Sequence, residues 1–106
     1  MQGKEVQIVD PLGIHARPAA QLVQTANRYR STITLTLPST GRHANAKSIT
    51  ALLALGVRHG STVSLTAHGD DEVAALAATL AMLIAEHLIG DQDDQSADTS
   101  KEGTVQ

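Results

Sequence analysis

A histidine, an arginine and a proline stand within four positions of one another, at His15, Arg17 and Pro18. The next residues include apolar side chains at the spacing of a buried helical stripe, namely Ala19, Leu22, Val23 and Ala26. A helix is therefore expected over residues 16–27. Pro18 suits its first turn, where a missing N–H group costs little. An imidazole and a guanidinium at the start of a helix could together bind an anion or transfer one.

His15 falls at or just outside the N-terminus of this helix. The first N–H groups of a helix lack intrahelical partners and its dipole is positive there, so the backbone of Ala16 and Arg17 can hold an anion. The same field disfavours imidazolium, and we predict a largely neutral, nucleophilic His15 near pH 7. Taken alone, His15 could also be a helix-terminal residue without chemistry, and Arg17 a solvated surface charge.

Composition limits the chemistry open to this chain. Its 106 residues suffice for one domain with a modest core, which must be aliphatic because Tyr29 is the one aromatic residue. Apart from Tyr29, the chain lacks the aromatic side chains on which nucleic acid bases stack, so no nucleic acid partner is expected. The chain has no cysteine, which excludes disulfides and thiol nucleophiles. The histidines other than His15 show no i, i+4 pairing, so they are expected on the surface; they are His43, His59, His68 and His87. We expect neither a metal nor a cofactor.

Charge and hydropathy divide the chain into two parts. Residues 90–106 contain five acidic residues and one lysine, a net charge of −4, and almost no apolar residues, whereas residues 1–89 are nearly neutral. We expect a folded domain over residues 1–89 and a disordered acidic tail over residues 90–106, or the start of a linker to another domain. No stretch approaches the ~18 apolar residues of a membrane span, so a cytoplasmic protein without membrane insertion is expected.

Local patterns predict the element order β-α-β-β-α-β-α. Strands are expected over residues 4–9, 32–37, 42–44 and 61–67, where apolar and polar residues alternate; Asp10-Pro11 ends the first of them. Ser48 can N-cap a short helix that ends at Gly56, and the acids after Gly69 suit the N-terminus of a last helix. The apolar stripe of that last helix is expected to comprise Val73, Leu76, Ala77, Leu80, Leu83, Ile84 and Leu88.

This order predicts an α+β fold of the open-faced β-sandwich type. The second and third strands form a hairpin through the turn at residues 38–41, and the fourth strand is expected between the first and the second. Three helices would then cover one face of a four-stranded antiparallel sheet. The other face, rich in threonine, is left to solvent.

The segment Gly13-Ile14-His15-Ala16-Arg17-Pro18-Ala19 resembles the phosphorylation-site motif of the HPr family, the histidine-containing phosphocarrier proteins of the bacterial phosphoenolpyruvate-dependent sugar phosphotransferase system. Lys47-Ser48-Ile49 before Leu55-Gly56-Val57 resembles its second signature, and the resemblance covers roughly residues 4–88. It implies that enzyme I phosphorylates His15 on Nδ1 and that His15 passes the group to sugar-specific EIIA proteins. The chain would be a stoichiometric carrier, not an enzyme, with Arg17 stabilising the phosphoryl group.

The second signature leaves two questions open. Ser48 could act as an N-cap alone, or it could also be phosphorylated by a dedicated kinase, as the matching serine is in low-GC Gram-positive members of the family. Ile49 and Leu53 could belong to the core, or they could form with Thr50 an exposed patch that docks partners. Lys47 would lie at the basic rim of such a patch, and binding would then weaken as salt rises.

Three functions are compatible with the sequence. The first, which we favour, is a phosphocarrier in sugar uptake, expected to be monomeric. The second is a carrier of a related relay, such as nitrogen-related or dihydroxyacetone kinase phosphotransfer. The third is a regulatory protein-binding module of the same fold, which would be expected to lose the histidine.

Overall fold

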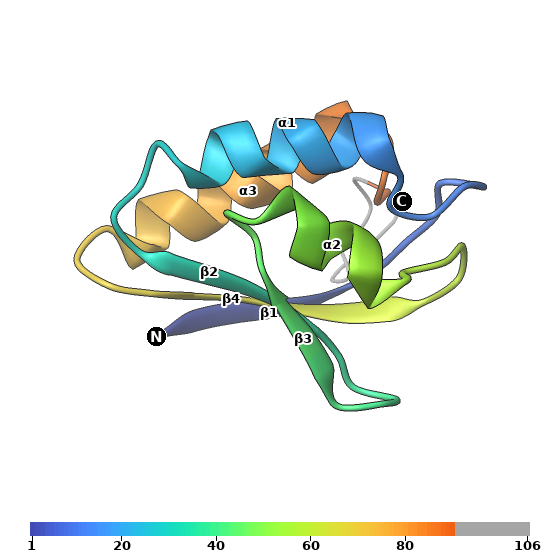
Figure 1. The fold of residues 1–106 in the computed structure, drawn as a ribbon. Helices are drawn as coiled ribbons and strands as arrows, with labels where there is room; N and C mark the ends of the chain where they lie inside the picture. Colours follow the sequence, from blue (N-terminus) through green and yellow to red (C-terminus); the bar gives the residue numbers. More distant parts are fainter. Residues whose placement is uncertain (91–106) are drawn as a thin grey trace, which may run out of the picture.

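The computed structural model describes residues 1–90, which form seven elements in the predicted order (Figure 1). The strands are β1 (Gln2–Gln7), β2 (Thr32–Leu37), β3 (Arg42–Asn45) and β4 (Thr62–His68). The helices are α1 (Ala16–Ala26), α2 (Ile49–Leu55) and α3 (Glu72–Ala85). The strands make one antiparallel sheet in the order β1-β4-β2-β3, and the helices lie on one side of it. The predicted α+β open-faced sandwich is confirmed.

The core lies between the helices and one face of the two central strands. Ile33 pairs with Ala67 and Leu35 with Leu65 across β2 and β4, and all four side chains are buried. Their neighbours alternate to the opposite face, where the threonines of β2 are at least partly exposed. The alternation in the sequence therefore gives the correct inward face of both strands.

The first strand lies earlier in the chain than predicted. Ile8 follows the ladder between β1 and β4, and its N–H group still donates to the carbonyl oxygen of Ser61 (2.9 Å), the residue before β4. The N–H group of Val9 donates instead to the carbonyl oxygen of Leu88 (2.7 Å), in the segment after α3. Ile8 is still buried, and Val9 is 40% exposed. Side chains thus keep alternating after the ladder has ended, so the pattern does not reveal where the strand stops.

The predicted apolar stripe of α3 is wrong in part. The residues of α3 that are buried are Ala75, Thr79 and Leu83. Val73 is 66% exposed, and Ala77 is also exposed. Leu88 is buried but follows the helix, with its N–H group donating to the carbonyl of Leu83 (2.9 Å). Since α3 is apolar on nearly all sides, hydrophobicity alone does not determine which side faces the sheet.

The acids after Gly69 lie at the N-terminus of α3 as predicted, with Glu72 in the first turn and its carboxylate accepting the N–H group of Gly69 (3.1 Å). Asp71 is the N-cap residue, yet its side chain makes no capping hydrogen bond. Instead its Oδ1 accepts from the N–H group (3.0 Å) and the hydroxyl (2.5 Å) of Ser31, and its Oδ2 accepts from the N–H group of Arg30 (3.0 Å). Asp71 therefore ties the start of α3 to the chain that leads into β2.

The stability that Asp71 provides should depend on pH. The hydrogen bond from the Ser31 hydroxyl, followed by that from the Arg30 N–H group, holds the pKa of Asp71 below its usual range. A carboxyl group with a lower pKa in the folded state stabilises the fold above about pH 4, and this contribution is lost as the pH falls through the folded pKa. We expect Asp71→Asn to lower the free energy of unfolding at neutral pH, with the difference from wild type shrinking below about pH 4.

Urea unfolding at a series of pH values measures this effect. Asp70→Asn makes the same change at the exposed neighbouring residue and should have a smaller effect. Equal effects of the two variants at neutral pH would contradict this account of Asp71.

Two expectations concern the membrane and the tail. No helix in the described part of the chain is both long enough and apolar enough to cross a bilayer. The predicted tail of residues 90–106 lies, apart from Gly90, outside the described residues. The domain boundary at residue 89 stays a prediction.

Candidate functional site

The loop between β1 and α1 holds His15 in place. The N–H group of Gly13 donates to the carbonyl of Asp10 (2.9 Å), and the N–H group of Ile14 donates to the carbonyl of Val57 (3.1 Å). Gly13 has φ +67°, and a Cβ atom there would lie 2.2 Å from the carbonyl oxygen of Val57. Glycine is therefore required for the loop to approach the segment that follows α2. This contact fixes the chain immediately before His15.

His15 is the N-cap residue of α1. Its backbone is extended, and its carbonyl accepts the N–H group of Ala19 (3.0 Å), the first hydrogen bond of the helix. Its side chain makes no capping hydrogen bond and is 37% exposed. The ring thus lies at the surface beside the start of the helix and remains available to a ligand.

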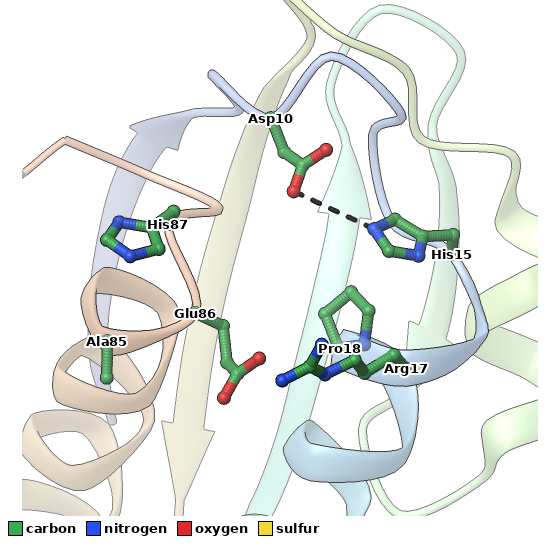
Figure 2. Close-up of a pocket in the computed structure, with 7 residues that line it drawn as sticks. All are labelled: Asp10, His15, Arg17, Pro18, Ala85, Glu86 and His87. Atoms are coloured by element: carbon green, nitrogen blue, oxygen red, sulfur yellow. Dashed lines mark ion pairs between the residues drawn. The ribbon is translucent and has the colours of Figure 1, made fainter.

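The site is completed by the end of α3. Helices α1 and α3 run in opposite directions, so the start of α1 lies beside the end of α3 (Figure 1). An open pocket of about 290 Å³ lies between them (Figure 2). The residues that line it are Asp10, His15, Arg17, Pro18, Ala85, Glu86 and His87. The pocket therefore combines the predicted pair, His15 and Arg17, with residues about seventy positions further along the chain.

Asp10 lies beside the imidazole. Its Oδ2 atom is 3.7 Å from Nε2 of His15, and its side chain is 16% exposed. A carboxylate at this distance favours positive charge on the ring and so opposes the effect of the helix N-terminus. In the sequence Asp10 signals only the end of a strand. Its proximity to the ring results from the turn between Asp10 and Gly13, which the sequence pattern does not reveal.

Arg17 and Glu86 face the same pocket from different helices. Figure 2 shows the guanidinium and the carboxylate directed toward one another, and within residues 1–90 neither forms an ion pair. Arg17 is exposed and lines the same pocket as the His15 ring. Sequence reasoning missed Glu86. The element order implies that α1 and α3 run antiparallel, but it does not show which residues after α3 face the start of α1.

His87 forms the edge of the pocket. It has φ 60°, a left-handed conformation that is uncommon for residues other than glycine, directly after the C-cap of α3. Figure 2 shows its ring on the side away from His15. The histidines expected on the surface, His43, His59, His68 and His87, are all exposed. Within the described residues no group of three His, Cys, Asp or Glu side chains is placed to hold a metal ion.

Lys47-Ser48-Ile49, the first part of the second signature, lies at the start of α2. The hydroxyl of Ser48 accepts the N–H group of Ala51 (3.2 Å), which confirms Ser48 as an N-cap. The ammonium group of Lys47 donates to the carbonyl of Tyr29 (2.8 Å) and is thus engaged by the main chain after α1. Lys47 therefore contributes to the fold as well as to the charge of this surface.

An apolar surface is exposed on α2. Ile49 and Leu53 are 39% and 42% exposed, and Thr50 between them is exposed as well. These three residues are called the α2 patch below. The sequence allows Ile49 and Leu53 to lie either in the core or at the surface, and the structure shows them at the surface.

The chain matches known phosphocarriers over most of its length. The family model for the PTS HPr component phosphorylation site matches residues 2–85. The phosphocarrier protein HPr of Mycoplasma genitalium is 45% identical over 83 residues, which are 78% of this chain and 93% of that protein. The solved structure of a mycoplasma histidine-containing phosphocarrier protein has a TM-score of 0.81 and 30% identity, covering 84% of this chain and 99% of the other. An HPr dimer from Thermoanaerobacter tengcongensis has a TM-score of 0.63 and 38% identity, covering 82% and 98%. The chain therefore belongs to the HPr family of phosphocarrier proteins.

Proposed function

We propose that this chain carries a phosphoryl group on Nδ1 of His15 in the cytoplasm. Phosphorylated enzyme I donates the group, and sugar-specific EIIA proteins accept it. The observation that supports this most is the shared pocket of the His15 ring, the Arg17 guanidinium and the start of α1. The chain acts stoichiometrically and not as an enzyme, because each molecule must pass on its phosphoryl group before it can accept another.

The pocket residues have the properties that such a carrier needs. The lone pair of Nδ1 attacks phosphorus, and the bond to the donor breaks with its electron pair on the donor. The N–H groups of Ala16 and Arg17 and the guanidinium would stabilise the phosphoryl oxygens. The dipole is worth about 0.3–1 kcal/mol and a charged hydrogen bond about 1.5–3 kcal/mol. This modest stabilisation holds the group and still allows it to leave.

Incubation with phosphoenolpyruvate and a general enzyme I tests the proposal. We expect a mass increase of one phosphoryl group that is labile in acid, as phosphohistidine is. A protein that takes up no phosphoryl group would overturn the carrier function. A panel of EIIA proteins and acceptors from related relays then identifies the relay, since the chemistry is the same and only the partners differ.

We further propose that the α2 patch docks these partners. Ile49→Ser should raise the KM for enzyme I by about fivefold, corresponding to about 1 kcal/mol for an apolar contact, with little change in kcat. Val73→Ser is the matched control, because Val73 is an exposed apolar residue on α3 outside the patch. Steady-state phosphorylation kinetics measure both variants. Equal KM values for Ile49→Ser and wild type would exclude Ile49 from the docking surface.

Regulation by phosphorylation of Ser48 is a separate proposal. The N-cap hydrogen bond of Ser48 already accounts for a serine at this position. Incubation with a serine kinase that acts on HPr proteins tests whether Ser48 is also phosphorylated.

We propose that the chain is a monomer, although the relative from Thermoanaerobacter tengcongensis was solved as a dimer. Sedimentation equilibrium distinguishes the two states.

A further inference from the structure

We propose that Asp10 is a positioning residue for phosphoryl transfer. Its carboxylate would keep the proton of the neutral His15 ring on Nε2 and balance the positive charge that the ring gains when Nδ1 takes up the phosphoryl group. This inference rests on the proposed carrier function. It concerns a residue outside the heptapeptide motif of residues 13–19, and it comes from the geometry of the β1–α1 loop.

Local hydrogen bonds hold the Asp10 carboxylate in place. Its Oδ1 atom accepts the N–H group of Leu12 (2.8 Å), and its main-chain carbonyl accepts the N–H group of Gly13 (2.9 Å). With Oδ1 engaged, Oδ2 faces the ring at 3.7 Å from Nε2 (Figure 2). This distance exceeds that of a hydrogen bond, so Oδ2 acts on the ring through its charge. The side chain is only 16% exposed, which limits screening by water.

The carboxylate determines which ring nitrogen is the nucleophile. A neutral imidazole carries its proton on one nitrogen, and the environment of the two nitrogens decides which one. A negative charge beside Nε2 stabilises an N–H group there, because the partial positive charge of the proton faces the anion. Nδ1 then keeps its lone pair. In enzymes, a carboxylate that is hydrogen-bonded to a catalytic histidine fixes its tautomer. Asp10 would favour one tautomer through its charge alone.

The charge balance of the transfer gives Asp10 its second role. When Nδ1 attacks, the N–P bond forms, the donor keeps the electrons of the broken bond, and the ring retains its proton on Nε2. The ring is then a phosphorylated imidazolium with one positive charge. When the group moves on, the N–P electron pair returns to Nδ1 and the neutral ring is restored. No proton needs to move in either direction, and Asp10 stabilises the cationic ring throughout.

Asp10 must act against the other charges at the pocket. The positive start of α1 and the Arg17 guanidinium both disfavour a cationic ring. Glu86 approaches from α3 and has the opposite sign, but it makes no ion pair with His15. Among the described residues, Asp10 is the carboxylate that lies within ion-pair distance of the ring. It is therefore the group placed to offset the helix and the arginine.

The Asp10→Asn variant removes the negative charge of the side chain but preserves the hydrogen bond that holds the turn. The side-chain oxygen can still accept the N–H group of Leu12, but the negative charge beside Nε2 is gone. ¹⁵N NMR of histidine-labelled protein, recorded where the ring is neutral, reports the populations of the two tautomers. We expect mainly the Nε2–H form in wild type and a several-fold shift toward the Nδ1–H form in Asp10→Asn. The rate of phosphoryl uptake from enzyme I should fall about tenfold, as expected for a partly screened charge near the ring.

Two further variants serve as controls. Glu86→Gln removes one negative charge from the same pocket but not from beside Nε2, so the tautomer populations should not change. Asp10→Ala also removes the acceptor for Leu12, so it should lower thermal stability more than Asp10→Asn does. Unchanged tautomer populations or unchanged uptake in Asp10→Asn would overturn the role of Asp10. If wild type itself takes up no phosphoryl group, the carrier function fails, while the tautomer comparison still tests how Asp10 acts on the ring.

Discussion

The His15→Ala variant is expected to take up no phosphoryl group from enzyme I, because the substitution removes the proposed nucleophile. The fold should survive, since the side chain is 37% exposed and makes no capping hydrogen bond. The free energy of unfolding should stay within about 0.5 kcal/mol of wild type. Intact-mass spectrometry measures the uptake, and thermal unfolding measures the stability.

His43→Ala is the matched control for this variant. His43 is an exposed histidine on β3 and does not line the pocket, so its removal should leave uptake unchanged. A folded His15→Ala protein that still retained the phosphoryl label would exclude His15 as the carrier residue.

The Arg17→Ala variant should slow both the gain and the loss of the phosphoryl group. A charged hydrogen bond is worth about 1.5–3 kcal/mol, which corresponds to about 10- to 150-fold in rate. Both directions should be affected because the guanidinium stabilises the charge on the phosphoryl oxygens during the transfer itself. Arg17→Lys keeps the charge but loses the planar pair of donors, so its rates should fall between those of Arg17→Ala and wild type. Single-turnover measurements with enzyme I and with an EIIA acceptor give the two rates.

Arg30→Ala controls for the loss of one positive charge. Arg30 is exposed and lies beyond the end of α1, at the opposite end of that helix from His15. If Arg30→Ala slowed transfer as much as Arg17→Ala, a contact between Arg17 and the phosphoryl group would be excluded, and general electrostatic attraction would explain the rates.

Local signals in the sequence predicted much of the fold. The alternation from Thr32 to Leu37 gives β2 with its observed bounds, because every second side chain has to enter the core. Ser48 and Gly56 give the two ends of α2, since each closes the helix by its own hydrogen bonds or backbone conformation. The position of His15 at the start of α1 depends on signals of the same kind.

The features that could not be predicted depend on tertiary contacts. One example is the side of α3 that faces the sheet. A helix with apolar residues on nearly all sides is oriented by its packing on the sheet and not by its own pattern. Glu86 enters the site only because α1 and α3 are antiparallel, and Asp10 does so only because the loop turns back at Gly13. The sequence identified the two residues proposed to contact the phosphoryl group, and the structure was needed to find the carboxylates around them.

The most direct test of the account is to locate the phosphoryl group on the ring. Histidine-labelled protein is phosphorylated with enzyme I and phosphoenolpyruvate, and the coupling between ³¹P and the ring ¹⁵N nuclei is measured by NMR. We predict a coupling to Nδ1 of His15. A coupling to Nε2, a phosphoryl group on another residue, or no phosphorylation would contradict the account.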